Sequence, residues 1–257
     1  MIRVAILGAG GRMGRMLTHV FQSAEDVTIV ARIETHDPEG IRDLDSSPVL
    51  TSLAEAEAFD VLVDFSVPAA SIQAAEEVAK RGCAWLLATT GLTAEDRETL
   101  RKRCASCALF EASNTSFGVA LMNRLAAIAA QALADWDCEI VETHHRHKVD
   151  APSGTALTLA KTISEARQRP SHILYERQSR RAARDTDDIG ISSLRGGSVA
   201  GEHQILWFGD QERLEIKHVA ENRAIFANGA LKITRWLAGK PAGLYDMSQF
   251  VQDIVGA

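Results

Sequence analysis

The chain has 257 residues, 46% hydrophobic and 24% charged, a composition typical of a folded globular protein rather than a disordered or fibrous one. This length exceeds the usual size of one domain, so we expect a larger domain and a smaller one. The net charge of −6 argues against a nucleic-acid binder, which normally shows a broad basic face, so any anion site must be local.

The first residues show no basic segment, long apolar segment or cleavage site, and no apolar stretch is long enough to span a bilayer. We therefore expect a cytoplasmic protein without membrane association, in which cysteines stay reduced. Cys104 and Cys107 have C-x-x-C spacing, but no second Cys or His pair completes a zinc set, which disfavours a redox or metal role there.

Strand-type and helix-type patterns alternate along the first 111 residues. Pro68 is expected to open a helix that Gly82 ends, and Thr93 with Asp96 resembles a capping box. The predicted strands are residues 2–7, 27–33, 61–65, 84–88 and 108–111, and the predicted helices are residues 12–24, 68–81 and 93–105. Such alternation predicts an α/β fold, a Rossmann-like doubly wound parallel sheet.

The pattern changes after Asn114, where we expect a smaller α+β domain with a mixed sheet. Residues 167–188 are polar and aperiodic, so we expect a long mobile loop there. The predicted helices there are residues 118–134 and 153–166, and the predicted strands are residues 138–143, 189–194, 203–208 and 213–219. A terminal helix is predicted at residues 222–238.

A glycine-rich turn, Gly8-Ala9-Gly10-Gly11-Arg12-Met13-Gly14, joins the first strand to the first helix. Glycines there permit close approach of backbone N–H groups to a pyrophosphate at the positive end of the helix, and Arg12 adds a candidate cation. The spacing departs from strict G-x-G-x-x-G, because position 13 is Met. A glycine turn with a purely structural role is the less favoured alternative.

Glu34 ends the second strand, where a dinucleotide site needs an acid for the ribose hydroxyls. Thr35 follows it and Arg32 lies within the strand, so we expect NADH as the favoured cofactor and NADPH as the alternative. Glu34 could also be a solvated acid at a strand end. Later strands of the sheet end at Phe65-Ser66, Ala88-Thr89-Thr90 and Ala112-Ser113-Asn114-Thr115, where we expect further cofactor contacts.

The segment His144-His145-Arg146-His147-Lys148 places five basic side chains together in an otherwise acidic chain. Clustered cations lower each other's pKa, so at least one histidine should exchange a proton near neutral pH, and Lys148 can fix a carboxylate. Ser153, Gly154 and Thr155 open the next helix and offer hydroxyls and backbone N–H groups to an anion. A small anionic substrate is therefore expected.

Two other interpretations of this segment are weaker. Three histidines could ligate a metal, but neighbouring Arg146 and Lys148 disfavour a divalent cation and no carboxylate completes the set. The segment could also be a solvated basic turn followed by one capping serine.

The chain resembles the 4-hydroxy-tetrahydrodipicolinate reductases, also called the dihydrodipicolinate reductase family. The most specific match is the stretch from His144 to Ala156, supported by Gly8 to Gly14, Thr89-Thr90-Gly91, Gly201-Glu202-His203 and Phe226-Ala227-Asn228-Gly229. The resemblance implies NAD(P)H-dependent reduction of a cyclic imine dicarboxylate with loss of water, in the diaminopimelate route to lysine. It also implies a homotetramer assembled through the second domain.

The resemblance also implies residue roles. His144 is the expected proton donor or acceptor and Lys148 the expected proton donor, whereas His145, Ser153, Gly154 and Thr155 are expected to bind substrate. The expected cofactor-binding residues are Gly8, Ala9, Gly10, Gly11, Arg12, Met13, Glu34, Thr35, Phe65, Ala88, Thr89, Thr90, Ala112, Ser113, Asn114 and Thr115. Residues 1–115 and 227–257 are expected to form the dinucleotide domain, and residues 116–226 the substrate-binding and oligomerisation domain.

Three positions depart from the family pattern. Thr35 stands where many relatives have Arg, which puts an NADPH preference in doubt, while Ala88 replaces a glycine and Thr115 an aromatic residue. Two rival functions share the glycine turn: another two-domain nucleotide-dependent dehydrogenase, and an NADH-sensing module without catalysis. The basic segment followed by Ser153-Gly154-Thr155 argues against the first rival, and the second would need no proton-transfer groups.

Overall fold

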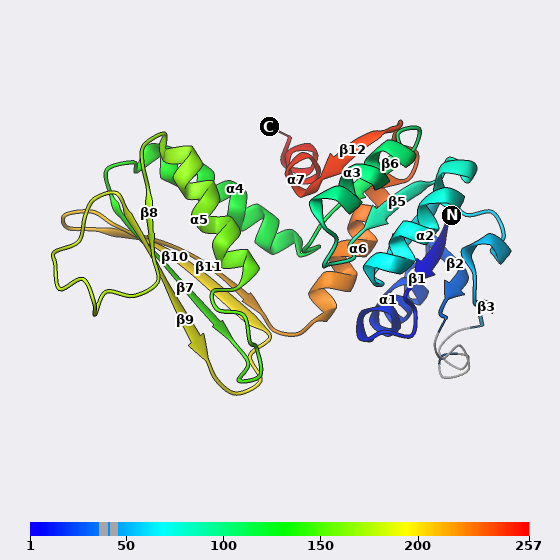
Figure 1. The fold of residues 1–257 in the computed structure, drawn as a ribbon, viewed down its shortest axis with the longest axis horizontal. Coiled ribbons are helices and arrows are strands. Elements are labelled where there is room, and N and C mark those ends of the chain that lie inside the picture. Colours follow the sequence, from blue (N-terminus) through cyan, green and yellow to red (C-terminus); the bar gives the residue numbers. More distant parts are fainter. Residues whose placement is uncertain (36–40, 42–45, 257) are drawn as a thin grey trace. The chain divides into compact units, whose positions relative to one another are not determined.

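The computed structural model describes residues 1–35, 41 and 46–256. They form two compact units, one of Met1–Phe117 with Ala224–Ala257 and the other of Gly118–Arg223. Each unit is built around its own sheet (Figure 1).

The first unit contains a seven-stranded sheet in the order β12-β6-β5-β4-β1-β2-β3, with every neighbouring pair parallel. The order reverses at β1, as it does in doubly wound dinucleotide folds. The predicted Rossmann-like sheet is confirmed. The strands are β1 (Ile2–Leu7), β2 (Val27–Ile33), β3 (Val49–Leu50), β4 (Val61–Asp64), β5 (Ala84–Leu87), β6 (Ala108–Glu111) and β12 (Gly243–Asp246).

Helices cover both faces of this sheet (Figure 1). Because side chains alternate along β1, Val4 and Ile6 pack with α1 (Arg12–Gln22), α6 (Ala224–Leu237) and α7 (Met247–Val255). Ala5 and Leu7 face the opposite layer, which contains α2 (Pro68–Arg81), α3 (Ala94–Arg103) and the short 3-10 helix η2 (Leu53–Glu55).

Local signals set the ends of α2 and α3. Pro68 stands in the first turn of α2, and Gly82 ends it in the left-handed region with φ of 64°. Thr93 and Asp96 form the predicted capping box of α3, each side chain accepting from the backbone of the other.

The second unit contains a mixed five-stranded sheet, as predicted, in the order β11-β10-β7-β9-β8. β10 is antiparallel to β7 and β11, whereas β9 is parallel to β7 and β8. One face packs against α4 (Phe117–Ala132) and α5 (Gly154–Arg167) (Figure 1). The strands are β7 (Asp137–His144), β8 (His172–Leu174), β9 (Asp188–Arg195), β10 (Gly201–Phe208) and β11 (Arg213–Ala220).

The expectation that residues 167–188 form one long loop is wrong in part, because β8 lies within it and pairs with β9. A three-residue strand is too short to show periodicity in the sequence. Ion pairs across the segment also order it: Arg180 and Arg177 contact Asp188, and Arg184 contacts Asp137. Strand pairing and ion pairs therefore give this segment a defined structure that the sequence pattern does not predict.

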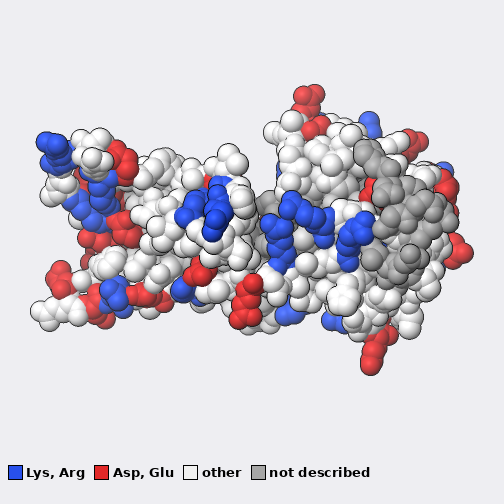
Figure 2. All heavy atoms as spheres, turned by 90° about the horizontal axis from the view of Figure 1, so that it is seen from below, with Lys and Arg blue, Asp and Glu red and all other residues white. Residues whose placement is uncertain are grey.

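In the described part of the chain, none of the helices is both long and apolar enough to cross a membrane. All four cysteines are buried free thiols. On the face shown in Figure 2, acidic and basic side chains are interspersed, with Lys and Arg gathered in local patches.

Candidate functional site

The glycine turn is packed too tightly for side chains at two of its positions. A Cβ at Gly8, whose φ is 80°, would lie 2.8 Å from Ser66 Cα, and a Cβ at Gly14 would lie 2.1 Å from the Gly8 carbonyl oxygen. Gly14 thus lets α1 pack directly on the turn. Gly11 caps α1 without a side-chain hydrogen bond, so the backbone N–H groups of the first turn have no side-chain cap to compete with an anion.

Glu34 lies against this turn. Its Oε2 accepts a hydrogen bond of 2.8 Å from the backbone N–H of Gly10, and a Cβ at Gly10 would lie only 2.5 Å from that oxygen. Thr35 beside it is exposed. Arg32 is 1% exposed and its guanidinium donates inward to Ser47, so this cation is directed into the interior.

Two cavities extend from the turn along the carboxyl ends of the strands, and both are lined by Phe65 and Ser66. The first, of about 240 Å³, is lined by Leu7, Gly8, Gly11, Ile33, Glu34, Thr35, Phe65, Ser66, Val67 and Ala70. The second, of about 260 Å³, is lined by Met13, Phe65, Ser66, Ala88, Thr90, Ala112, Ser113, Asn114, Thr115 and Phe226.

Among the described residues, four of the predicted cofactor residues line neither cavity: Ala9, Gly10, Arg12 and Thr89. Arg12 is exposed at the first position of α1, and Ala9 is part of the core. Thr89 is buried, and its hydroxyl donates a 2.8 Å bond to Asp64.

Asp64 is a buried carboxylate that joins the ends of β4 and β5. Its oxygens also accept hydrogen bonds from the hydroxyls of Ser66 (2.5 Å) and Ser71 (2.6 Å). Burial raises the pKa of Asp64, although these hydrogen bonds oppose that rise. The network fixes Ser66, which lines both cavities.

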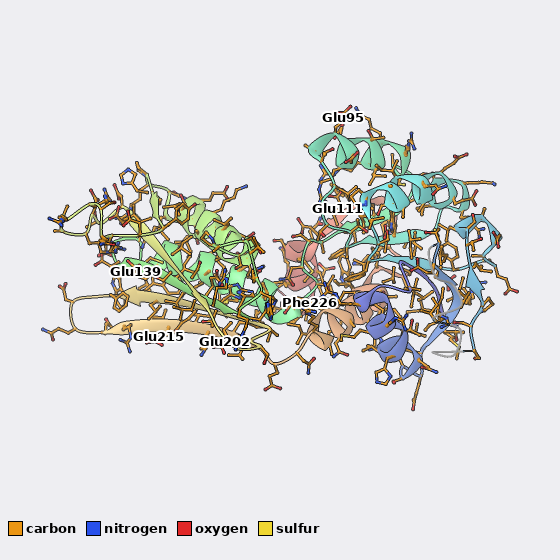
Figure 3. The ribbon with its side chains drawn as sticks, turned by 60° about the horizontal axis from the view of Figure 1, so that its bottom comes forward. Glu95, Glu111, Glu139, Glu202, Glu215 and Phe226 are labelled. Atoms are coloured by element: carbon orange, nitrogen blue, oxygen red, sulfur yellow. The ribbon has the colours of Figure 1, made fainter. Side chains whose placement is uncertain are left out.

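Ser66 lines both cavities at a strand end where a cofactor contact was expected, whereas no role was predicted for Phe226. Phe226 comes from α6, in the part of the chain that returns to the first unit (Figure 3). Its neighbour Gly229 is required because a Cβ there would lie 1.8 Å from the Thr115 carbonyl oxygen. The motif from Phe226 to Gly229, which supports the family resemblance, was therefore the sequence feature that could have predicted a role for Phe226.

These features fit a dinucleotide. The first turn of α1 has no side-chain cap to compete with a pyrophosphate, Glu34 presents a carboxylate for ribose hydroxyls, and the two adjoining cavities provide space on either side of Phe65 and Ser66.

The basic segment begins at the end of β7 in the second unit. Alternation along β7 buries Cys138, Ile140, Glu142 and His144 on one face. His144 Nδ1 lies 2.5 Å from Glu142 Oε2. Arg195 on β9 binds the same carboxylate through both terminal nitrogens, at 2.9 and 2.7 Å. His144 is thus one end of a buried ionic network.

The other cations of the segment have different environments. His145 is half-buried, and burial together with the charges of Arg223 and His147 lowers its pKa, as the clustering predicts. Arg146 and His147 are exposed. Lys148 Nζ lies 2.9 Å from Asp150 Oδ2, and its side chain is only 21% exposed.

Ser153 caps α5, and its Oγ accepts a 3.2 Å bond from the backbone N–H of Ala156. The same oxygen lies 3.0 Å from His203 Nε2. Burial, with a smaller effect from His144, lowers the pKa of His203 to about 4, so this ring is neutral at pH 7. A Cβ at Gly154 would meet no atom within 4 Å, so the helix start faces open space.

Glu142, Arg195 and His203 were not predicted to have roles. The signal available for Glu142 was the period-two pattern, because a charged residue follows Cys138 and Ile140 on the core-facing positions of one strand. Within residues 1–35, 41 and 46–256, no group of three or more His, Cys, Asp and Glu side chains is arranged to hold a metal ion.

Together, the doubly wound sheet with its glycine cradle and the buried histidine network are typical of a nucleotide-dependent oxidoreductase. Two family models match the chain: "Dihydrodipicolinate reductase, N-terminus" over residues 2–115, and "Dihydrodipicolinate reductase, C-terminus" over residues 118–251. The chain belongs to the dihydrodipicolinate reductase family.

Relatives support this assignment over the whole chain. A 4-hydroxy-tetrahydrodipicolinate reductase from Rhodopseudomonas palustris is 40% identical, with 99% of this chain and 97% of the relative covered. One from Psychrobacter arcticus is 38% identical, with 100% and 95% covered. The activity is NAD(P)H-dependent reduction of 4-hydroxy-tetrahydrodipicolinate, a step of lysine biosynthesis.

Solved structures agree with the fold. The dipicolinate-bound dihydrodipicolinate reductase from Paenisporosarcina has a TM-score of 0.80 and 27% identity, with 96% of this chain and 97% of that chain covered. A myo-inositol dehydrogenase from Corynebacterium glutamicum has a TM-score of 0.63 at 15% identity, with 95% and 90% covered, and shares the fold alone.

Proposed function

We propose that this reductase uses NADH in preference to NADPH. The observation that carries this proposal is the Glu34 carboxylate at the glycine turn, next to the uncharged and exposed Thr35. A carboxylate accepts hydrogen bonds from both ribose hydroxyls of NADH, whereas it repels the 2′-phosphate of NADPH. Arg32 does not compensate, because its guanidinium is directed into the interior.

We also propose that residues 1–115 with 227–257 bind the dinucleotide and that residues 116–226 bind the substrate. Bound in the first unit, the dihydronicotinamide supplies the hydride. The cavity that contains Met13 and Phe226 is the proposed nicotinamide side, and the one that contains Glu34 is the proposed adenosine side. We also propose that the residues expected to bind the cofactor, from Gly8 to Thr115, contact the dinucleotide.

In the second unit, we propose that His144 exchanges a proton with the substrate and that Lys148 donates one. His145, Ser153, Gly154 and Thr155 would hold the two carboxylates. The open space before Gly154 at the positive end of α5 supports this role, since an anion there meets backbone N–H groups. The relative that binds dipicolinate, a cyclic dicarboxylate, supports the same substrate class.

A homotetramer formed through the second unit is the proposed assembly. The sheet face opposite α4 and α5 carries the exposed apolar side chains of Leu194, Phe208 and Val219. Apolar patches of this kind commonly mark protein contacts. Light scattering of the purified protein tests this proposal, and a monomeric mass would refute it. The cytoplasm remains the proposed compartment, supported by four free thiols.

The decisive experiment supplies the condensation product of pyruvate and aspartate semialdehyde and follows oxidation of NADH and NADPH in separate reactions. We expect higher kcat/KM with NADH. Equal or higher kcat/KM with NADPH would refute the cofactor preference. His144→Gln and Lys148→Met should each reduce turnover while retaining NADH binding, and full turnover in either variant would refute the role of that residue.

A further inference from the structure

Two ionisable side chains occupy core-facing positions at the end of β7. Cys138 and Ile140 precede them on the same face and are fully buried, and Glu142 is also 0% exposed. A buried carboxylate is costly unless hydrogen bonds and an opposite charge compensate it. The groups that offset the buried charge of Glu142 therefore indicate the role of this residue.

Three kinds of donor converge on Glu142. Arg195 contributes both terminal nitrogens, at 2.9 and 2.7 Å, and the backbone N–H of Ser153 donates at 3.2 Å. The remaining partner is His144 Nδ1, at 2.5 Å. Burial alone would raise the pKa of Glu142, but the hydrogen bonds with Arg195 and His144 outweigh it and lower this pKa to about 2. Glu142 is therefore a carboxylate at neutral pH.

An ionised carboxylate only accepts hydrogen bonds, so its neighbour Nδ1 must carry a proton. The lone pair of a neutral His144 is then on Nε2. This second nitrogen faces Gly201, where a Cβ would lie 3.0 Å away, and the absent side chain leaves room beside Nε2.

The same network connects His144 with the helix start proposed to bind substrate. Ser153 donates its N–H to Glu142 and caps α5 with its hydroxyl. His203 contacts that hydroxyl and packs edge-on against His144, with ring centroids 5.3 Å apart. The charged or titratable groups that act on His144 are thus Glu142 with its partner Arg195, His203 on β10, and His145 on the following loop.

We propose that Glu142, held by Arg195, is a positioning residue that fixes the His144 ring with its proton on Nδ1, so that Nε2 is the nitrogen that exchanges a proton with the substrate. The proposal rests on the role given to His144 above. In the donating step, the bond between Nε2 and its proton breaks, the proton passes to the reduced substrate, and the neutral ring keeps its Nδ1 proton. The Glu142 carboxylate stabilises the imidazolium form that precedes this step.

The first test is a long-range ¹H–¹⁵N spectrum of the wild-type protein, with His144 assigned by comparison with His144→Gln. We expect the neutral His144 ring to show a protonated Nδ1 and an unprotonated Nε2. A neutral ring with its proton on Nε2 would overturn the proposal without any Glu142 variant.

The second test is Glu142→Gln, compared with Glu139→Gln. Glu139 also belongs to β7 (Figure 3) but faces Arg177 and Arg184, outside the proposed site. We expect Glu142→Gln to reduce kcat roughly 100-fold, a loss typical of impaired general acid–base catalysis, with little change in KM for NADH. In the long-range ¹H–¹⁵N spectrum of this variant, part of the neutral His144 ring should carry its proton on Nε2, because a glutamine amide can also donate to Nδ1.

Glu142→Asp keeps the charge and should recover part of the lost kcat, and it serves as the second variant if Glu142→Gln does not fold. An unchanged kcat together with an unchanged Nδ1 proton in folded Glu142→Gln would overturn the inference. Full activity in His144→Gln would instead overturn the proposed role of His144, so the two failures are distinguishable.

Discussion

The cofactor preference can be tested by returning a cation to the position after the ribose-binding acid. Thr35 is exposed and lines the cavity that contains Glu34, so an arginine there adds its charge beside the proposed ribose site. A charge-assisted hydrogen bond contributes about 1.5 to 3 kcal/mol, and exposure to solvent reduces this to about 1 to 2 kcal/mol. Thr35→Arg should therefore raise kcat/KM for NADPH by roughly 5- to 30-fold.

Thr35→Gln is the matched control, since it lengthens the side chain without adding charge. Oxidation of NADH and NADPH is followed separately for both variants and the parent, at low and at high salt. The gain with NADPH should shrink at high salt, because the new pair is exposed and screened. The reasoning is refuted if Thr35→Arg and Thr35→Gln show the same ratio of kcat/KM for the two cofactors.

Three further predictions concern groups around the network and the thiols. Gly201→Ala should lower kcat roughly tenfold with unchanged NADH binding, because its Cβ would lie 3.0 Å from His144 Nε2; unaltered turnover would contradict this. The unfolded chain binds a proton at His203 near pH 6.5, whereas the folded chain does so only near pH 4, so stability should fall by up to about 3 kcal/mol as pH drops through that window. Urea unfolding at pH 7 and pH 4.5 measures this loss of unfolding free energy. The loss should be smaller in His203→Gln, and an equal loss in the parent and the variant would rule the explanation out. Burial raises the thiol pKa values of Cys83, Cys104 and Cys138 to about 12. A thiol reagent should therefore modify the native protein far more slowly than the urea-unfolded chain. Rapid labelling of the native protein would contradict this.

Local chemistry explains why much of the fold could be predicted from the sequence. Pro68, Gly82 and the Thr93–Asp96 capping box act on backbone groups within one or two turns, so their effect is visible in a short window. β3, β8 and β12 have two, three and four residues and were not predicted, because a neighbouring strand supplies their partners. The expectation that residues 222–238 form the terminal helix is wrong, since β12 and α7 follow it.

The sequence by itself determined the glycine turn, the strand-end turns and the composition of the basic segment. Only the tertiary structure decided which of these groups act together. Arg195 reaches Glu142 across 53 positions and His203 reaches Ser153 across 50, through the register of β7, β9 and β10. Such partnerships depend on how strands align, and no local pattern specifies that alignment. The packing of β9 against β7 therefore places Arg195 on the carboxylate of Glu142, which in turn is the fixed partner of His144.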